Sequence, residues 1–405
     1  MALTIQSLLQ ENFAAFAAKY RISPQMHRAA IMMMQCRTSA MGGHINSCPD
    51  GHFHQIAYNS CRHRSCPQCA WLPREQWLLR WKARLLPCPH HHCIFTLPHD
   101  LNQIWRYNKA EFADTLFHSA VETLQELLGD PAYLGGRVGL LCALHTWNQT
   151  LQSHIHLHML VTAGGLGADG QWLQLKKACL LPRKVLMIKF RGKFKAKFMD
   201  KVNRGVIKLP PSMTVPMLQR LLKSLTKVDW NVKILQRYDS GAGVATYLAR
   251  YLKGGPIGNS RLLELRHEQS IAGQRRHVSF RYRLGTHEGG DGKQQGTASL
   301  EVDRFIGRLL DHVPPKRYQA VRGYGLYSGN QHSRINEART ALGLAEAVAE
   351  DTPTLSWQEL CEQAGLIQTC RCPKCGKALV SHSPFDAGRG PPRACDWANV
   401  TKEAA

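Results

Sequence analysis

The sequence predicts an α+β protein in which helices pack on an antiparallel sheet. Runs of strand-forming residues alternate with helical patterns through the middle of the chain, and two of these runs are separated by only a short polar stretch, as in a hairpin. Hydrophobic residues make up 44% of the 405 positions and charged residues 20%, which is typical of a globular protein rather than a disordered one. A chain of this length can hold two or three domains.

The hydrophobic periodicity places the elements along the chain. The first 35 residues have an amphipathic helical pattern, residues 36–71 lack periodicity but are dense in Cys, His, Gly and Asn, and a Trp- and Arg-rich helix follows at 71–86. Strands are expected at residues 92–97, 138–147, 155–162, 231–237 and 277–283. Helices are expected at residues 101–128, 185–203, 215–225, 244–253 and 302–310, and a glycine-rich loop at 285–296.

The charge balance indicates the class of partner. Lysine and arginine number 52 against 29 acidic residues, a formal net charge of +23. This excess favours a polyanion, and nucleic acid rather than a membrane, because no segment reads as a lipid anchor. The chain contains no apolar stretch of membrane-spanning length and its N-terminus lacks a signal-peptide pattern, so we expect a cytoplasmic, nucleoid-associated protein.

A group of histidines marks the predicted hairpin. His154, His156 and His158 alternate with apolar residues, so an extended chain directs their imidazoles to one face. His145 ends the preceding strand-like run, and antiparallel pairing across a short loop would bring it close to His156 and His158. Three neutral imidazoles can hold a divalent metal while leaving coordination positions open for a substrate. The expected ligands are therefore His145, His156 and His158, with Gln149, Gln152 and His154 as weaker candidates for the third position.

A later helical segment carries two tyrosines. Tyr247 and Tyr251 are four residues apart and share one helix face, between glycines that mark both helix ends. A tyrosine hydroxyl has a pKa of about 10 and attacks phosphorus only with help from a metal or a base. Arg250 and Lys253 would neutralise the flanking phosphates. The competing interpretation is a core-facing tyrosine pair, which the histidine hairpin makes less attractive.

The fourteen cysteines are clustered rather than spread as a disulfide framework, which favours zinc. Cys66 and Cys69 form a CxxC half-site, and the expected set around it is completed from Cys48, His52 and Cys61, with His54 as an alternative and a second site involving Cys36 and His44 left open. Cys370, Cys372 and Cys375 form a second CxxC-type half-site near the C-terminal end, with Cys361 or Cys395 as candidate completing ligands of a zinc ribbon, and a few exposed thiols as the alternative interpretation.

The segment 183–208 is strongly basic. Three phenylalanines recur every four residues and predict a core-facing stripe, whereas four cations on the adjacent faces are expected to contact DNA: Lys193, Lys197, Lys201 and Arg204.

These blocks together resemble a known superfamily. A His-apolar-His strand, an upstream His and two tyrosines one helical turn apart are similar to the HUH endonucleases, which include rolling-circle initiators, conjugative relaxases and certain transposases. The order of GGHINSC, YNSCRHRSCPQC, LHTWNQTLQSHIHLH, YLARYLKGGPI and HVSFRYR, within residues 36–330, more closely resembles transposases of the insertion sequence 91 family. In that family a second cysteine commonly stands where this chain has Gly51.

The resemblance implies both fold and function. It implies an HUH-type central sheet, with an N-terminal helix and zinc-binding module at 1–85, a catalytic DNA-nicking domain at 86–330 and a C-terminal segment with a possible zinc ribbon at 331–405. His156 and His158 would hold Mg²⁺ or Mn²⁺, Tyr247 and Tyr251 would be the nucleophile candidates, and zinc would be structural. The substrate would be single-stranded DNA at transposon ends and at the target.

Three alternatives remain open at this stage. A plasmid-type replication initiator or relaxase would use the same chemistry. Residues 154–160 also fit the signature of histidine-triad nucleotide hydrolases. These enzymes need no metal, so metal dependence distinguishes them from an HUH-type transposase. A zinc-dependent DNA-binding regulator would close the histidine site with a fourth protein ligand.

Overall fold

The computed structural model describes residues 3–175, 180–249, 255–270, 273–284, 294–329, 332–345, 355–366 and 370–388. The chain divides into two compact units, neither of them continuous in sequence. Unit 1 comprises Met1–Gln76, Lys253–Val313 and Pro353–Ala405, and unit 2 comprises Trp77–Leu252 and Pro314–Thr352. Unit 1 thus contains residues from each of the three predicted domains, 1–85, 86–330 and 331–405.

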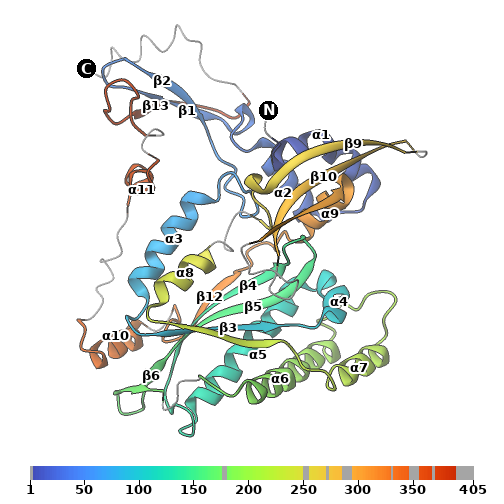
Figure 1. Ribbon diagram of the computed structural model, residues 1–405, viewed down its shortest axis with the longest axis vertical. Helices are drawn as coiled ribbons and strands as arrows, with labels where there is room; N and C mark the ends of the chain where they lie inside the picture. Colours follow the sequence, from blue (N-terminus) through green and yellow to red (C-terminus); the bar gives the residue numbers. More distant parts are fainter. Residues whose placement is uncertain are drawn as a thin grey trace. The chain divides into compact units, whose positions relative to one another are not determined.

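Unit 1 contains two three-stranded antiparallel sheets. One has the order β13-β1-β2 and the other β11-β10-β9 (Figure 1). Its strands are β1 (Gly43–Ser47), β2 (His54–Tyr58), β9 (Leu262–Ser270), β10 (Gly273–Arg283), β11 (Gln295–Glu301) and β13 (Val380–Phe385). Its helices are α1 (Ile5–Lys19), α2 (Pro24–Gln35), α9 (Val302–Asp311) and α11 (Trp357–Gln363). Helices α1 and α2 pack against α9, which covers β10 and β11.

The helical pattern predicted for residues 1–35 forms two helices rather than one. The chain leaves α1 at Tyr20 and begins α2 at Pro24. Ser23 caps α2 by accepting a hydrogen bond from the Met26 amide, and Pro24 takes the first helical position, where its missing N–H costs nothing. Because a residue before proline avoids the helical conformation, the same dipeptide prevents α1 from continuing.

Unit 2 is built on a five-stranded antiparallel sheet of order β12-β4-β5-β3-β8. These strands are β3 (His90–Thr96), β4 (Gly139–Trp147), β5 (Ser153–Thr162), β8 (Val232–Tyr238) and β12 (Val321–Gly325), and a small hairpin is formed by β6 (Gly164–Leu166) and β7 (Trp172–Gln174). The helices are α4 (Asn102–Tyr107), α5 (Lys109–Gly129), α6 (Arg183–Asn203), α7 (Val215–Ser224), α8 (Gly241–Ala249) and α10 (His332–Ala341), together with the part of α3 (Trp71–Arg84) from Trp77 on. The predicted antiparallel sheet with helices on it is therefore confirmed.

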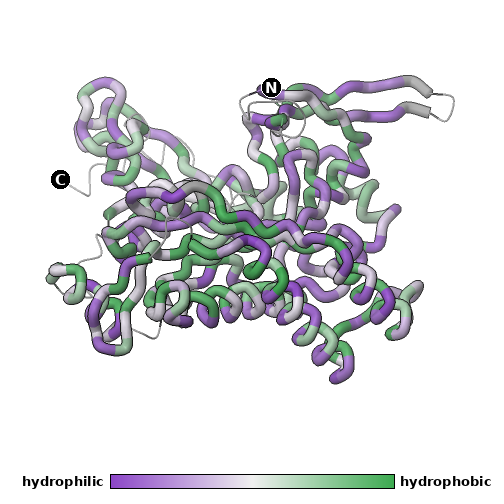
Figure 2. The backbone as a smooth tube through the Cα atoms, turned by 60° about the horizontal axis from the view of Figure 1, so that its bottom comes forward, coloured by the Kyte–Doolittle hydropathy of each residue, from purple (hydrophilic) through white to green (hydrophobic). Residues whose placement is uncertain are grey.

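The two faces of this sheet are covered by different helices. Cys142, Met159 and Phe95 share one face and pack in the core with α5 and α6. Leu141 and Leu160, on the opposite face, pack with α3 and α8. Figure 1 shows α5 and α6 on one side of the sheet and α3 and α8 on the other. The covering helices alternate between hydrophilic and hydrophobic residues along their length (Figure 2), as one-sided packing requires.

Two sequence expectations can be compared directly with this core. The stripe Phe190, Phe194 and Phe198 is fully buried against the sheet, so its prediction as core is confirmed. The glycine-rich loop predicted for residues 285–296 ends earlier than expected, because β11 begins at Gln295. Residues 285–293 lie outside the described part of the chain. Within the described ranges, no helix has the length and apolar character that crossing a bilayer requires.

Candidate functional site

The predicted hairpin exists and sets the positions of the histidines. In the turn between β4 and β5, Asn148 Oδ1 accepts hydrogen bonds from the amides of Thr150 (3.0 Å) and Gln152 (2.8 Å). An asparagine side chain that bonds backbone groups two residues ahead is a strong turn former. The resulting register places His145 directly opposite His156.

Three imidazoles converge on the α8 side of the sheet. His145 Nδ1 lies 3.0 Å from His156 Nε2, which lies 3.1 Å from His158 Nε2, and all three residues are buried. Nitrogen ligands about 2.1 Å from one ion lie roughly 3.0–3.4 Å apart, so this spacing fits a bound divalent cation. Burial lowers the pKa of His156 to about 3 and that of His158 well below its usual range, which keeps both rings neutral, as metal ligands must be.

Hydrogen bonds behind the rings orient two of these ligands. His156 Nδ1 lies 2.9 Å from the carbonyl oxygen of His154, which can only accept, so Nδ1 carries the proton and the lone pair is on Nε2. His158 Nδ1 lies 2.8 Å from Nε2 of His92, a residue on β3 whose pKa burial lowers to about 4. Such partners behind metal ligands fix ring orientation and tautomer.

The group holds three side chains. Among the described residues, no fourth His, Cys, Asp or Glu joins His145, His156 and His158. Two of the weaker candidates are not part of this group: Gln152 accepts a hydrogen bond from Asn148 within the turn. His154, whose ring centroid lies 4.7 Å from that of His156, contacts His99 (3.3 Å). Three nitrogen ligands leave positions open for a substrate oxygen, which is the pattern of catalytic rather than structural sites.

Helix α8 lies on the same face of the sheet as the histidines. Its residues Ala245 and Leu248 pack in one cluster with Leu160, which is two residues beyond His158 on β5. A Cβ atom at Gly241 would lie only 3.1 Å from the His90 ring, so glycine permits this close approach.

The two tyrosines predicted as nucleophiles can be located only in part. The backbone of Tyr247 belongs to α8, whereas its side chain and the whole of Arg250, Tyr251 and Lys253 lie outside the described residues. The structure therefore brings the helix that carries Tyr247 to the histidine face.

The four cations predicted to contact DNA lie on the opposite side. Helix α6, which carries three of them, packs with α5 on the face turned away from the histidines. Each cation forms an ion pair: Lys193 with Glu126 (2.9 Å), Lys197 with Glu122 (2.9 Å), Lys201 with Glu111 (2.8 Å) and Arg204 with Asp200 (3.0 Å). The four cations thus lie against acidic side chains, and their contact with DNA stays a prediction.

A different lysine lies on the histidine face. Lys233 on β8 is opposite Ile94 on β3, which is itself opposite His158 on β5. Residues opposite each other in an antiparallel sheet point to the same side, and two strand spacings amount to roughly 10 Å. Lys233 is exposed. Lys233 could not be predicted as a site residue, because an isolated lysine on an edge strand has no distinguishing sequence pattern.

Four cysteines form a first sulfur cluster in unit 1. Cys36, Cys61, Cys66 and Cys69 are buried, and the Sγ atoms of Cys61 and Cys69 lie 3.6 Å apart. Sulfurs bound tetrahedrally about 2.3 Å from one zinc ion lie roughly 3.8 Å apart, so the group fits zinc. Hydrogen bonding to the Cys61 thiol lowers the pKa of Cys36 to about 7, and hydrogen bonds from neighbouring thiols, first Cys36, lower that of Cys69. Thiolates are the form that binds zinc.

A second group differs from the sequence-based grouping. Cys48 and His52 do not join Cys61, Cys66 and Cys69, whose fourth partner is Cys36. They lie instead with Cys372 and Cys375. The sequence could not pair these half-sites because they are more than 300 residues apart and the contact depends on the folded sheet.

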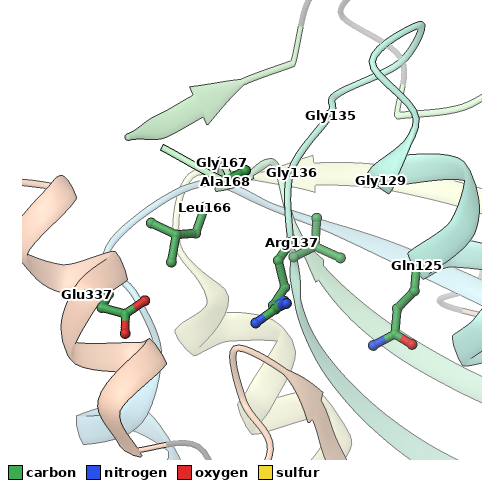
Figure 3. A pocket seen from close by; sticks show the side chains of 10 residues that line it. Gln125, Gly129, Gly135, Gly136, Arg137, Leu166, Gly167, Ala168 and Glu337 are labelled. Atoms are coloured by element: carbon green, nitrogen blue, oxygen red, sulfur yellow. The ribbon is translucent and has the colours of Figure 1, made fainter. Parts of the chain in front are cut away.

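A cavity of about 450 Å³ lies at the other end of β4 from the histidines. Arg137 and Gln125 point toward the same space, with Glu337 of α10 across from them (Figure 3). The strand between Gly139 and His145 spans roughly 20 Å, so the cavity is separate from the histidine group.

Comparison with known proteins gives a consistent result. Residues 139–334 match a family model described as a putative transposase, and residues 8–97 match one described as a transposase zinc-binding domain. The chain is 32% identical over 398 residues to a putative transposase of Sinorhizobium fredii, covering 95% of this chain and 97% of that protein. It is 28% identical over 360 residues to the transposase for insertion sequence element IS801 of Pseudomonas savastanoi pv. phaseolicola, covering 86% of this chain and 81% of that protein.

No solved structure matches the chain. The Cys36 group lies inside the segment that matches the zinc-binding domain, which supports structural zinc. With its zinc-binding domain, its transposase domain and relatives along almost its whole length, the chain belongs to the insertion sequence 91 family of transposases.

Proposed function

We propose that this transposase cleaves and rejoins single-stranded DNA through a tyrosine nucleophile positioned beside a metal-binding histidine group, as in HUH endonucleases. The observation that carries the proposal is the shared face: His145, His156 and His158 converge on the side of the sheet where α8 packs. The same face carries the exposed Lys233, which would attract the phosphate backbone.

The three imidazoles would hold Mg²⁺ or Mn²⁺, which when bound polarises a phosphodiester. His154 and His92 keep the ring tautomers of His156 and His158 suited to that role through the hydrogen bonds at their Nδ1 atoms. The protein's contribution is thus a preformed, buried set of neutral nitrogen ligands that needs no rearrangement before the substrate arrives.

The chemical step is a transesterification. The phenolic oxygen of Tyr247 or Tyr251 forms a bond to phosphorus while the bond from phosphorus to the 3′ oxygen breaks. The phenolic proton ends on the released 3′-hydroxyl, and the 5′ end of the strand stays attached as a phosphotyrosine. One phosphodiester replaces another, so the reverse reaction with a different 3′-hydroxyl joins strands without external energy.

A pair of tyrosines suits two successive strand exchanges. One tyrosine would hold the first 5′ end while the other accepts a second strand, at the transposon end or at the target. The transposase relatives favour transposition over plasmid replication or conjugation as the setting for this chemistry.

The test uses labelled single-stranded DNA from the element's ends, incubated with the full chain and Mn²⁺ or Mg²⁺. The unaltered chain is compared with the Tyr247→Phe variant, the Tyr251→Phe variant and the variant that carries both substitutions. We expect a metal-dependent covalent protein–DNA adduct that the double variant does not form, and the single variants rank the two tyrosines.

Two results would contradict the proposal. Cleavage by the double variant would mean that water is the nucleophile. Activity that persists after chelation would favour the histidine-triad chemistry, in which a histidine attacks phosphorus.

A further inference from the structure

Two loops from distant parts of the chain meet in unit 1. The first follows β1 and contains Cys48 and His52, and the second precedes β13 and contains Cys372 and Cys375. The transposase zinc-binding match covers only residues 8–97, so it does not include the second loop.

The two loops have the same backbone construction. The Cys48 amide donates to the carbonyl of Phe53, and the Cys372 amide donates to that of Lys377, both at 2.8 Å and both five residues ahead. The flanking pairs also correspond, since Ser47 pairs with His54, and Arg371 with Ala378. Each loop is therefore the tip of a hairpin with the same register.

Each hairpin tip also contains a glycine in the left-handed region. Gly51 and Gly376 both have φ of +72°, which a residue with a side chain rarely adopts. Their amides donate to the carbonyls of Cys48 and Cys372, respectively, both at 2.9 Å. The glycines stand at different positions, three residues after Cys48 and four after Cys372, and each tip carries a second ligand within its turn, His52 in the first and Cys375 in the second.

The side chains of the two tips converge. Cys48 Sγ lies 3.4 Å from Cys375 Sγ and 4.0 Å from His52 Nδ1, and the four ligand atoms all lie within 4.8 Å of one another. These separations are close to the roughly 3.8 Å expected between sulfurs on a tetrahedral zinc ion. Three thiolates and one imidazole complete a four-coordinate site of the structural type.

The contacts around the group join the same two loops. Lys377 Nζ lies 2.7 Å from Asp50 Oδ1, and Cys48 and Cys372 are buried in a small cluster with Leu379. Beyond the tips, β13 pairs with β1, with Ser47 opposite Val380 (Figure 1). The C-terminal segment is thus the third strand of the sheet that the N-terminal segment begins.

We propose that Cys48, His52, Cys372 and Cys375 form a second structural zinc site, which fastens the C-terminal hairpin to the N-terminal module. The site is a zinc ribbon assembled from the two ends of the chain. It is separate from the Cys36 group, and its existence does not depend on the chemistry at the histidines.

Zinc content of the full chain tests the site. Because the three histidines would also take up zinc, the measurement uses a chain carrying His156→Ala and His158→Ala. We expect two zinc ions per chain in that background, and one after adding Cys372→Ser or Cys375→Ser. Cys370→Ser, which removes a buried thiol from the same segment but from neither cluster, should keep two.

The ligand His52 gives a milder test in case a cysteine variant fails to fold and loses both ions. His52→Ala should lower the content to one, whereas His52→Cys, which supplies a thiolate, should keep two. Two zinc ions per chain in both the Cys372→Ser and Cys375→Ser variants would overturn the proposal. So would a disulfide between Cys48 and Cys375 in the purified protein.

Hydrogen exchange gives an independent readout. Loss of the second zinc should increase exchange at the amides of Val380–Phe385 while the amides of α1 stay protected. Unchanged protection of β13 in the Cys375→Ser variant would show that zinc does not fasten this hairpin.

Discussion

His145 and His156 lie directly opposite each other on β4 and β5, with Nδ1 and Nε2 3.0 Å apart. Their pairing depends on the strand register, because a slip of one residue would turn every side chain of β5 to the other face. The turn at Asn148 fixes that register through its side-chain hydrogen bonds. A hydrogen-bonded turn therefore determines whether the buried group of three histidines can form.

The first prediction concerns the third ligand. His145→Ala should weaken Mn²⁺ binding on the order of 10²-fold or more, because it removes one of three nitrogen ligands. Gln152→Ala, in the adjoining turn, should change the affinity little. Isothermal titration calorimetry with Mn²⁺ measures both, and an equal loss in the two variants would remove His145 from the ligand set.

The second prediction concerns His92, which lies behind His158. His92→Phe should weaken Mn²⁺ binding by about 10- to 100-fold, because His158 Nδ1 loses the partner that fixes its tautomer. His92→Gln, whose amide oxygen can still accept, should retain most of the affinity. His99→Ala is the control, an exposed imidazole that contacts His154 instead. Equal affinities of the Phe and Gln variants would assign His92 a packing role only.

The third prediction concerns the approach of α8 to the sheet. Gly241→Ala would place a Cβ atom 3.1 Å from the His90 ring and 3.2 Å from Leu160, so the helix or these neighbours must give way by a few tenths of an ångström. We expect at least a 10-fold lower rate of adduct formation with unchanged Mn²⁺ affinity, since displacements near 1 Å can cost about 10²-fold. Gly243→Ala, whose Cβ would meet nothing within 4 Å, is the matched control. The prediction fails if both variants react at the same rate.

The fourth prediction compares the exposed Lys233 with the half-buried Lys197, which lies on the opposite face of the sheet. Lys233→Gln should weaken single-stranded DNA binding. It should also reduce the slope of log K against log salt concentration by about one, because one phosphate contact is lost. Lys197→Gln, which breaks an ion pair with Glu122, should leave that slope unchanged. The slopes come from anisotropy titrations over a range of salt concentrations. A lower slope for Lys197→Gln alone would instead support the DNA contact predicted from the sequence.

The sequence was most informative where one period repeats. The alternation of His156 and His158 with apolar neighbours predicted both the strand and the side on which the histidines gather, because β5 is a central strand with two different environments. The stripe beginning at Phe190 predicted the buried face of α6 for the same reason. Both patterns are local, so no knowledge of the remaining chain was needed.

The sequence was least informative where a structure depends on distant partners. The strand β11 alternates between exposed and half-buried residues and forms by pairing with β10. His92 belongs to a run of three consecutive histidines, so no period distinguishes the one that reaches His158. Cys-Pro pairs begin at Cys48, Cys66, Cys88 and Cys372, so the sequence does not single out the two tips that meet in the folded sheet.

The pairing of β1 with β13 has a consequence for protein synthesis. Ser47 leaves the ribosome about 340 residues before Phe385, which at typical translation rates is roughly 20 to 70 s. During that interval the β1–β2 hairpin has an open edge, the kind of edge that pairs with other chains. A nascent transposase thus completes its N-terminal sheet only when nearly its whole length has been translated, and a product truncated before β13 would keep an aggregation-prone edge.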